Sequence, residues 1–180
     1  MWNIPNSLTA FRIVLVPILV AVLLTEMPDR EYWGLGIFVV ATVTDYFDGF
    51  IARRTGAETV MGALLDPIAD KLLISAAFIS LVELGLAPAW MVTVIVGREF
   101  AVTALRMIAL ERGLAIAANR WGKAKMVSQV ITVAILILGR KLGSWIVLGN
   151  ITLWVALVLT VVSMVVYFWQ NRSVMTGENS

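Results

Sequence analysis

Six long apolar stretches follow one another along the chain, and the polar residues are concentrated between them. The stretches cover about residues 8–26, 32–54, 61–83, 87–111, 124–140 and 144–169. A helix that crosses the hydrocarbon core of a bilayer needs roughly 20 mostly apolar residues, a length that each stretch reaches or approaches. The pattern therefore predicts an all-α integral membrane fold, a bundle of six transmembrane helices.

The same pattern predicts one membrane domain over residues 1–170 and a polar C-terminal tail over residues 171–180. The connections between the stretches are short, and no polar segment is long enough to form a domain of its own. We therefore look for the functional site inside the bundle and at its ends.

Composition supports the membrane assignment and narrows the chemistry. Of the 180 residues 60% are hydrophobic and 14% charged, and the mean hydropathy is +0.90, well above that of average soluble domains. The net charge is only +2 and the basic residues are spread among apolar runs, so nucleic-acid binding gains no support. The chain has no cysteine and no histidine, which leaves carboxylates as the main metal ligands and favours hard cations such as Mg²⁺ or Mn²⁺.

The distribution of lysine and arginine predicts an orientation, because these residues are enriched in cytoplasmic loops. The basic residues at the end of the second stretch and around the connection between the fourth and fifth are Arg53, Arg54, Arg112, Arg120, Lys123 and Lys125. Both termini are then expected in the cytoplasm. Arg140 and Lys141, between the fifth and sixth stretches, run against this rule.

Ionisable residues inside the stretches are concentrated in the second, third and fourth. They are Asp45, Asp48, Asp66, Asp70, Lys71, Arg98, Glu99 and Arg106. Each costs about 2.5 to 3.5 kcal/mol at the centre of a membrane helix and persists mainly where it serves a site. The sequence predicts the site among these three helices, with the fifth and sixth providing lipid-facing or helix-packing surface.

Four aspartates form two pairs at helical spacing. Asp45 and Asp48 share one helix face, and Gly62, Asp66 and Asp70 share a face of the next helix. Four carboxylates that converge in a bundle cannot all stay charged without cations or protons. Two divalent ions would neutralise them and, at a separation of ~3.5 to 4 Å, would suit phosphoryl transfer.

The spacing of the aspartates is also compatible with two roles that involve no metal. The aspartates could form structural salt bridges with Arg53, Arg54, Lys71 or Arg98. They could instead relay protons or ions in a small transporter, since acidic residues inside membrane helices often mark ion pathways.

A longer motif contains all four aspartates. Asp45, Asp48, Gly49, Ala52, Arg53, Gly62, Asp66 and Asp70 occupy the eight defined positions of D-x2-D-G-x2-A-R-x8-G-x3-D-x3-D. The sequence thereby resembles the CDP-alcohol phosphatidyltransferase family. The segments NIPNSLTAFR at 3–12, VGREFAVTALR at 96–106 and GKAK at 122–125 resemble the bacterial members that use glycerol 3-phosphate.

The resemblance implies a six-helix homodimer in the bacterial cytoplasmic membrane, with a polar cavity open to the cytoplasm. It implies transfer of a phosphatidyl group from CDP-diacylglycerol to sn-glycerol 3-phosphate, which yields phosphatidylglycerophosphate and CMP. It also implies that Asp45, Asp48, Asp66 and Asp70 bind two divalent cations, Mg²⁺ or Mn²⁺, and that Asp70 is the general base.

Two further groups of residues follow from the resemblance and from the basic residues near it. The expected CDP-lipid contacts are Asn6, Thr9, Gly49, Ala52, Arg53, Thr59 and Gly62. The expected contacts to the acceptor phosphate are Arg98, Arg106, Arg112, Arg120, Lys123 and Lys125. Arg112 and Arg120 could instead be only the basic residues of a cytoplasmic loop, which set the orientation of the protein in the membrane. Arg98 could instead form a structural ion pair with Glu99.

The motif alone does not specify the acceptor. The same motif serves enzymes that use serine, inositol phosphate or another phosphatidyl lipid such as phosphatidylglycerol. The segments at 96–106 and 122–125 favour glycerol 3-phosphate over these, and an ion or proton transporter is the alternative from another class of protein.

Overall fold

The computed structural model describes residues 4–55, 60–111, 120–143 and 145–170, with side chains over 9–44, 68–109, 122–143 and 145–170. In this part of the chain it contains six helices and no strand. They are α1 Ile4–Leu24, α2 Arg30–Thr55, α3 Val60–Glu83, α4 Ala89–Glu111, α5 Arg120–Leu142 and α6 Trp145–Gln170. Each predicted stretch overlaps one helix over most of its length, so the all-α prediction is confirmed. The predicted tail, 171–180, lies outside the described residues.

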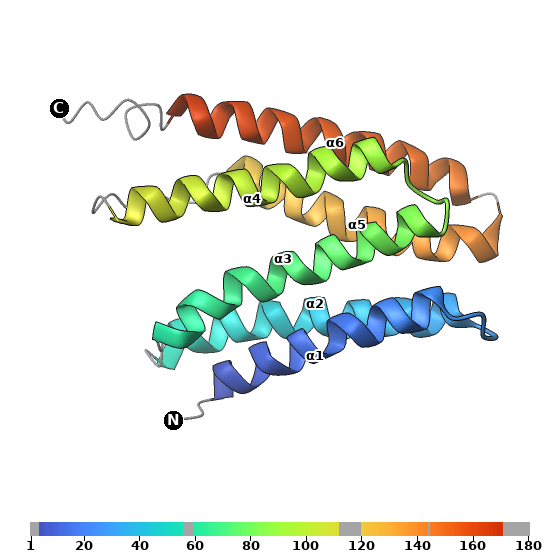
Figure 1. Cartoon of the computed structure of the whole chain (residues 1–180), viewed down its shortest axis with the longest axis horizontal. Coiled ribbons are helices and arrows are strands. Elements are labelled where there is room, and N and C mark those ends of the chain that lie inside the picture. The colour runs from blue at the N-terminus through green and yellow to red at the C-terminus, as the bar shows by residue number, and fades with distance from the viewer. Residues whose placement is uncertain (1–3, 56–59, 112–119, 144, 171–180) are drawn as a thin grey trace.

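Successive helices run in opposite directions (Figure 1). The carboxyl ends of α2 and α4 and the amino ends of α3 and α5 therefore lie toward the end of the bundle where α1 begins and α6 ends. Helix α1 packs against both α2 and α3, α5 packs along α6, and α4 contacts α3 and α6. The acidic motif, on α2 and α3, and the basic residues near the end of α4 and the start of α5 consequently lie in the same half of the molecule.

A continuous apolar core joins the helices. Its fully buried side chains include Leu19 on α1, Phe38 on α2, Phe78 on α3, Ile95 on α4 and Leu153 on α6. Close contact between α5 and α6 adds to it, since a Cβ atom on Gly149 would lie 2.6 Å from Leu136 Cδ2.

The outer surface carries many large apolar side chains that are exposed. Helix α6 alone exposes Val147, Ile151, Trp154 and Val158 along its length. Residues Gly122–Leu142 and Trp145–Gln170 are long and apolar enough to cross a membrane. In a soluble protein an apolar surface of this kind would promote aggregation. In a membrane protein the same surface faces lipid.

Charged residues also meet at the opposite end of the bundle from the acidic motif. Arg140 Nε lies 3.7 Å from Glu31 Oε1, and Lys141 forms an ion pair with Asp29 and lies over the ring of Tyr32. The two basic residues that contradict the orientation rule therefore have a structural role, because they connect the end of α5 to the start of α2 and the turn before it.

Candidate functional site

A polar cavity of about 220 Å³ lies between α3, α4, α5 and α6. Its lining combines charged, polar and apolar side chains. They are Asp70, Lys71, Ile74, Arg98, Glu99, Val102, Thr103, Arg106, Gly122, Lys123, Lys125, Met126, Gln129 and Tyr167. Among the side chains that the structure describes in this lining, five are basic and two are acidic, an excess of three positive charges. A cavity with one dominant charge sign concentrates ligands of the opposite sign, so this cavity suits an anion.

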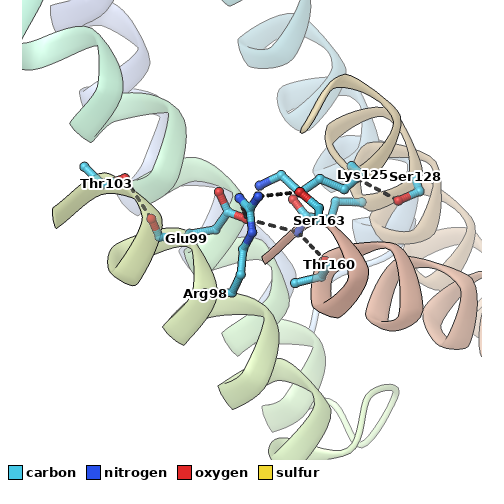
Figure 2. A network of polar contacts seen from close by, with 8 residues as sticks. Arg98, Glu99, Thr103, Lys125, Ser128, Thr160 and Ser163 are labelled. Atoms are coloured by element: carbon cyan, nitrogen blue, oxygen red, sulfur yellow. Dashed lines mark hydrogen bonds and ion pairs between the residues drawn. The ribbon is translucent and has the colours of Figure 1, made fainter. Parts of the chain in front are cut away.

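Glu99 is the centre of a polar network on the cavity wall (Figure 2). Its Oε1 atom accepts a hydrogen bond from Arg98 Nη1 at 3.3 Å, and Lys125 forms an ion pair with the same oxygen. Gln129 Nε2 lies 3.5 Å from it. Glu99, Arg98, Lys125 and Gln129 are all buried, as charged groups in an apolar bundle are when they compensate one another.

Helix α6 completes this network from the other side. Arg98 Nη2 donates to Ser163 Oγ at 2.6 Å, and Gln129 Nε2 donates to Thr160 Oγ1 at 3.3 Å. Figure 2 shows the side chains of Arg98 and Glu99 extending from α4 toward α5 and α6. Hydrogen bonds between side chains therefore connect three helices at the cavity.

A second contact to α6 holds Arg106. Its Nε donates to the hydroxyl of Tyr167 at 3.0 Å, and its guanidinium carbon lies 5.7 Å from the centre of the Tyr167 ring. Tyr167 is buried, whereas Arg106 is exposed. The buried ring thus gives a fixed support to an arginine that reaches toward solvent, by a hydrogen bond and a cation–π contact.

The structure brings five of the predicted site residues to one cavity. Asp70, half-buried on α3, lies on its wall together with Arg98, Arg106, Lys123 and Lys125. The pairing of Arg98 with Glu99 is also present, so Arg98 takes part in an ion pair and lines the cavity. Thr9 is fully buried on α1 and is not part of this lining.

The other predicted residues fall outside the described side chains. Asn6, Asp45, Asp48, Gly49, Ala52, Arg53, Gly62, Asp66 and Arg120 lie on helices with only their backbone described, and Thr59 and Arg112 lie outside the described residues.

The helix positions of the aspartates can still be compared. Asp45 lies ten residues before the end of α2 and Asp70 ten residues after the start of α3, which is about 15 Å of helix in each case. Asp48 and Asp66 lie seven and six residues from the same helix ends. Helices α2 and α3 run antiparallel and contact each other, so the two aspartate pairs lie at matching heights.

The sequence placed the site among the second, third and fourth helices, with Lys123 and Lys125 as further acceptor contacts. The cavity also has walls from α5, from Gly122 to Gln129, and from α6, which was expected to provide lipid-facing or packing surface and contributes Tyr167. A signal for this was present in the sequence. Thr160, Ser163 and Tyr167 follow one another at spacings of three and four and therefore share one face of an apolar helix.

Comparison with known proteins agrees with the motif. A family model described as CDP-alcohol phosphatidyltransferase matches residues 2–162. The chain is 41% identical to the CDP-diacylglycerol–glycerol-3-phosphate 3-phosphatidyltransferase of Bacillus subtilis, over 99% of its own length and 100% of the relative's. Proteins of the same name from Escherichia coli and Rickettsia bellii are 38% and 36% identical, over 96% and 92% of this chain and 96% and 93% of their own.

Proposed function

The chain belongs to the CDP-alcohol phosphatidyltransferase family, and on that premise we propose that it is a phosphatidylglycerophosphate synthase. It transfers a phosphatidyl group from CDP-diacylglycerol to sn-glycerol 3-phosphate, which yields phosphatidylglycerophosphate and CMP. The observation that carries the proposal is one cavity in which Asp70 lies beside five basic residues. Similarity over the whole chain to proteins named as transferases favours an enzyme over an ion or proton transporter.

The charge of the cavity supports a phosphorylated acceptor. Arg98, Arg106, Lys123 and Lys125 offer charge-assisted hydrogen bonds, which are about twice as strong as neutral ones and suit a phosphate dianion. Serine carries no phosphate and would leave this excess of positive charge uncompensated. Inositol phosphate shares the phosphate, so the preference for glycerol 3-phosphate rests on the relatives and not on charge alone.

Two divalent cations, Mg²⁺ or Mn²⁺, would be held by Asp45, Asp48, Asp66 and Asp70. The donor set fits hard cations, because all four ligands offer carboxylate oxygens, and the matching heights of the two pairs on α2 and α3 fit a shared site. When bound, the cations stabilise negative charge on the transferring phosphoryl oxygens.

The side chains of the chain supply the remaining steps. The basic residues hold the acceptor phosphate, which brings a hydroxyl of the same molecule toward Asp70. Asp70 accepts the proton of that hydroxyl. The oxygen then forms a bond to the phosphorus that carries the diacylglycerol, the bond from that phosphorus to the CMP oxygen breaks, and CMP leaves. The CDP-lipid contacts expected from Thr9, Gly49 and Arg53 would come from α1 and α2.

The membrane setting completes the proposal. The enzyme is a homodimer that crosses the bacterial cytoplasmic membrane six times, with both termini and the cavity on the cytoplasmic side. The acyl chains of the donor can then remain in the bilayer while the water-soluble acceptor enters from the cytoplasm. Lysines and arginines at that end of the bundle also suit the anionic lipids of the inner leaflet.

The acceptor can be tested directly. Purified protein supplied with CDP-diacylglycerol should release CMP with glycerol 3-phosphate, and at least about tenfold more slowly with serine, inositol phosphate or phosphatidylglycerol. Serine brings no phosphate to the basic cavity, and the relatives named for glycerol 3-phosphate set the expectation for the other two acceptors. Turnover with serine that exceeds turnover with glycerol 3-phosphate would contradict the proposal.

Replacement of the proposed base should remove turnover without removing the fold. Asp70→Asn keeps the size of the side chain but cannot accept the proton, so CMP formation should fall by about 10²- to 10⁴-fold. Asp29→Asn is the matched control at the opposite end of the bundle and should retain activity. Asp70→Asn protein that keeps full turnover would exclude this base.

Metal dependence gives an independent check. EDTA should abolish CMP release, and excess Mg²⁺ or Mn²⁺ should restore it, whereas sodium chloride at the same ionic strength should not. This follows because the four aspartates require bound dications to act together. Undiminished activity in the chelator would refute the metal site.

The orientation can be measured with single cysteines, since the chain has none of its own. Glu26, between α1 and α2, and Gln170, the last residue of α6, are both exposed and lie toward opposite ends of the bundle. In intact spheroplasts a membrane-impermeant maleimide should label Glu26→Cys, and should label Gln170→Cys only after the membrane is disrupted. The reverse pattern would invert the proposed topology.

A further inference from the structure

Two basic residues on the cavity wall share a single buried carboxylate. We propose that Glu99 is a positioning residue for the acceptor phosphate, which holds Arg98 and Lys125 side by side so that both face the same ligand. This inference rests on the proposed function and adds to it a role for a residue outside the acidic motif. The contacts that carry it are those of Glu99 Oε1 with Arg98 Nη1 and with the Lys125 ammonium.

Charge repulsion explains why such a residue is needed. Arg98 and Lys125 are each only 6% exposed, so water screens their mutual repulsion poorly. Both side chains are long and flexible, and without a compensating charge they would separate or turn toward solvent. The carboxylate between them opposes that separation before any acceptor has arrived.

The contacts with α6 fix the direction of the pair. Arg98 also donates to Ser163, and Gln129 connects Glu99 to Thr160, so the network has supports on three helices (Figure 2). A guanidinium has five N–H donors and an ammonium has three. The contacts to Glu99 and Ser163 use only part of this capacity, which leaves donors of Arg98 and Lys125 for a ligand in the cavity that both residues line.

Positioning of this kind should act on binding of the phosphorylated acceptor more than on the chemical step. Cations that are already held in place lose little conformational freedom when the phosphate binds. A phosphate gains from two fixed cations, whereas an acceptor without a phosphate gains little from them. Glu99 therefore contributes to selection of the acceptor although it carries the same sign of charge as the ligand.

The test is Glu99→Gln in the full chain, which keeps the shape of the side chain and removes its charge. We expect the KM for glycerol 3-phosphate to rise about tenfold, the size of effect of a lost charge-assisted hydrogen bond. The kcat and the KM for CDP-diacylglycerol should stay within about twofold, since both depend on other parts of the site. Inorganic phosphate should inhibit competitively against glycerol 3-phosphate, and its inhibition constant should rise by the same factor as the KM.

Glu31→Gln is a matched control. Glu31 also contacts two arginines, Arg30 at 3.5 Å and Arg140 at 3.7 Å, but at the opposite end of the bundle. It should leave the KM for glycerol 3-phosphate and the inhibition by phosphate unchanged. If Glu99 only stabilised the fold, Glu99→Gln would lower the fraction of active enzyme and hence the apparent kcat. The inhibition by phosphate would then stay as strong as in the wild type, which would contradict the inference.

Each outcome bears on the inference. An unchanged or lowered KM in Glu99→Gln would overturn it, because Glu99 would then be neutral toward the acceptor or compete with it. If that variant does not fold, Ser163→Ala removes only the hydroxyl that Arg98 Nη2 contacts, and should raise the same KM by about threefold. No rise there would also overturn the inference. Wild-type protein that releases no CMP would instead refute the proposed function itself.

Discussion

A charged side chain inside an apolar helix bundle is stable only where an opposite charge or a ligand compensates it, and this constraint organises the molecule. At one end of the bundle Arg140 and Lys141 meet Glu31 and Asp29. In the other half the Glu99 network balances only part of the positive charge at the cavity. In the first group Arg140 and Lys141 are partly exposed and each lies beside a carboxylate, so this group joins helices. The Glu99 network is buried and leaves positive charge at the cavity for a ligand. Burial together with incomplete compensation distinguishes the candidate binding site from the structural cluster.

The helices could be predicted from the sequence because their signal is local. Six apolar stretches of sufficient length give six helices. The predicted and observed helix ends agree within a few residues, because turns such as those at Asp29 and Gly85 interrupt the apolar pattern in the sequence. The presence of Asp70 and several basic residues in one cavity was also predictable. In an alternating bundle, residues near the end of one helix and the start of the next lie at the same end.

The contribution of α6 was harder to predict, for a physical reason. Serine and threonine inside an apolar helix commonly bond to the carbonyl of a preceding turn, as Thr42 does to Phe38 and Thr103 to Glu99. The spacing of such residues can mark a polar face of the helix, but it does not reveal which side chains that face contacts. Ser163 and Thr160 contact Arg98 and Gln129 only because α6 packs against α4 and α5, and this packing is not encoded in any local pattern. The contact between Glu99 and Lys125 could not be predicted for the same reason, since the two residues are 26 positions apart.

In the proposed function the two substrates would bind to different helices. The acidic motif belongs to α2 and α3, whereas the basic lining of the cavity comes largely from α4 and α5 and is supported by α6; Asp70 is on the acidic helix pair and also on the cavity wall. A motif that fixes the activated lipid and the base can thus stay unchanged while substitutions on α4, α5 and α6 alter the acceptor. The identity of the acceptor should therefore be sought in the contacts of Arg98, Lys125 and Arg106, not in the aspartates.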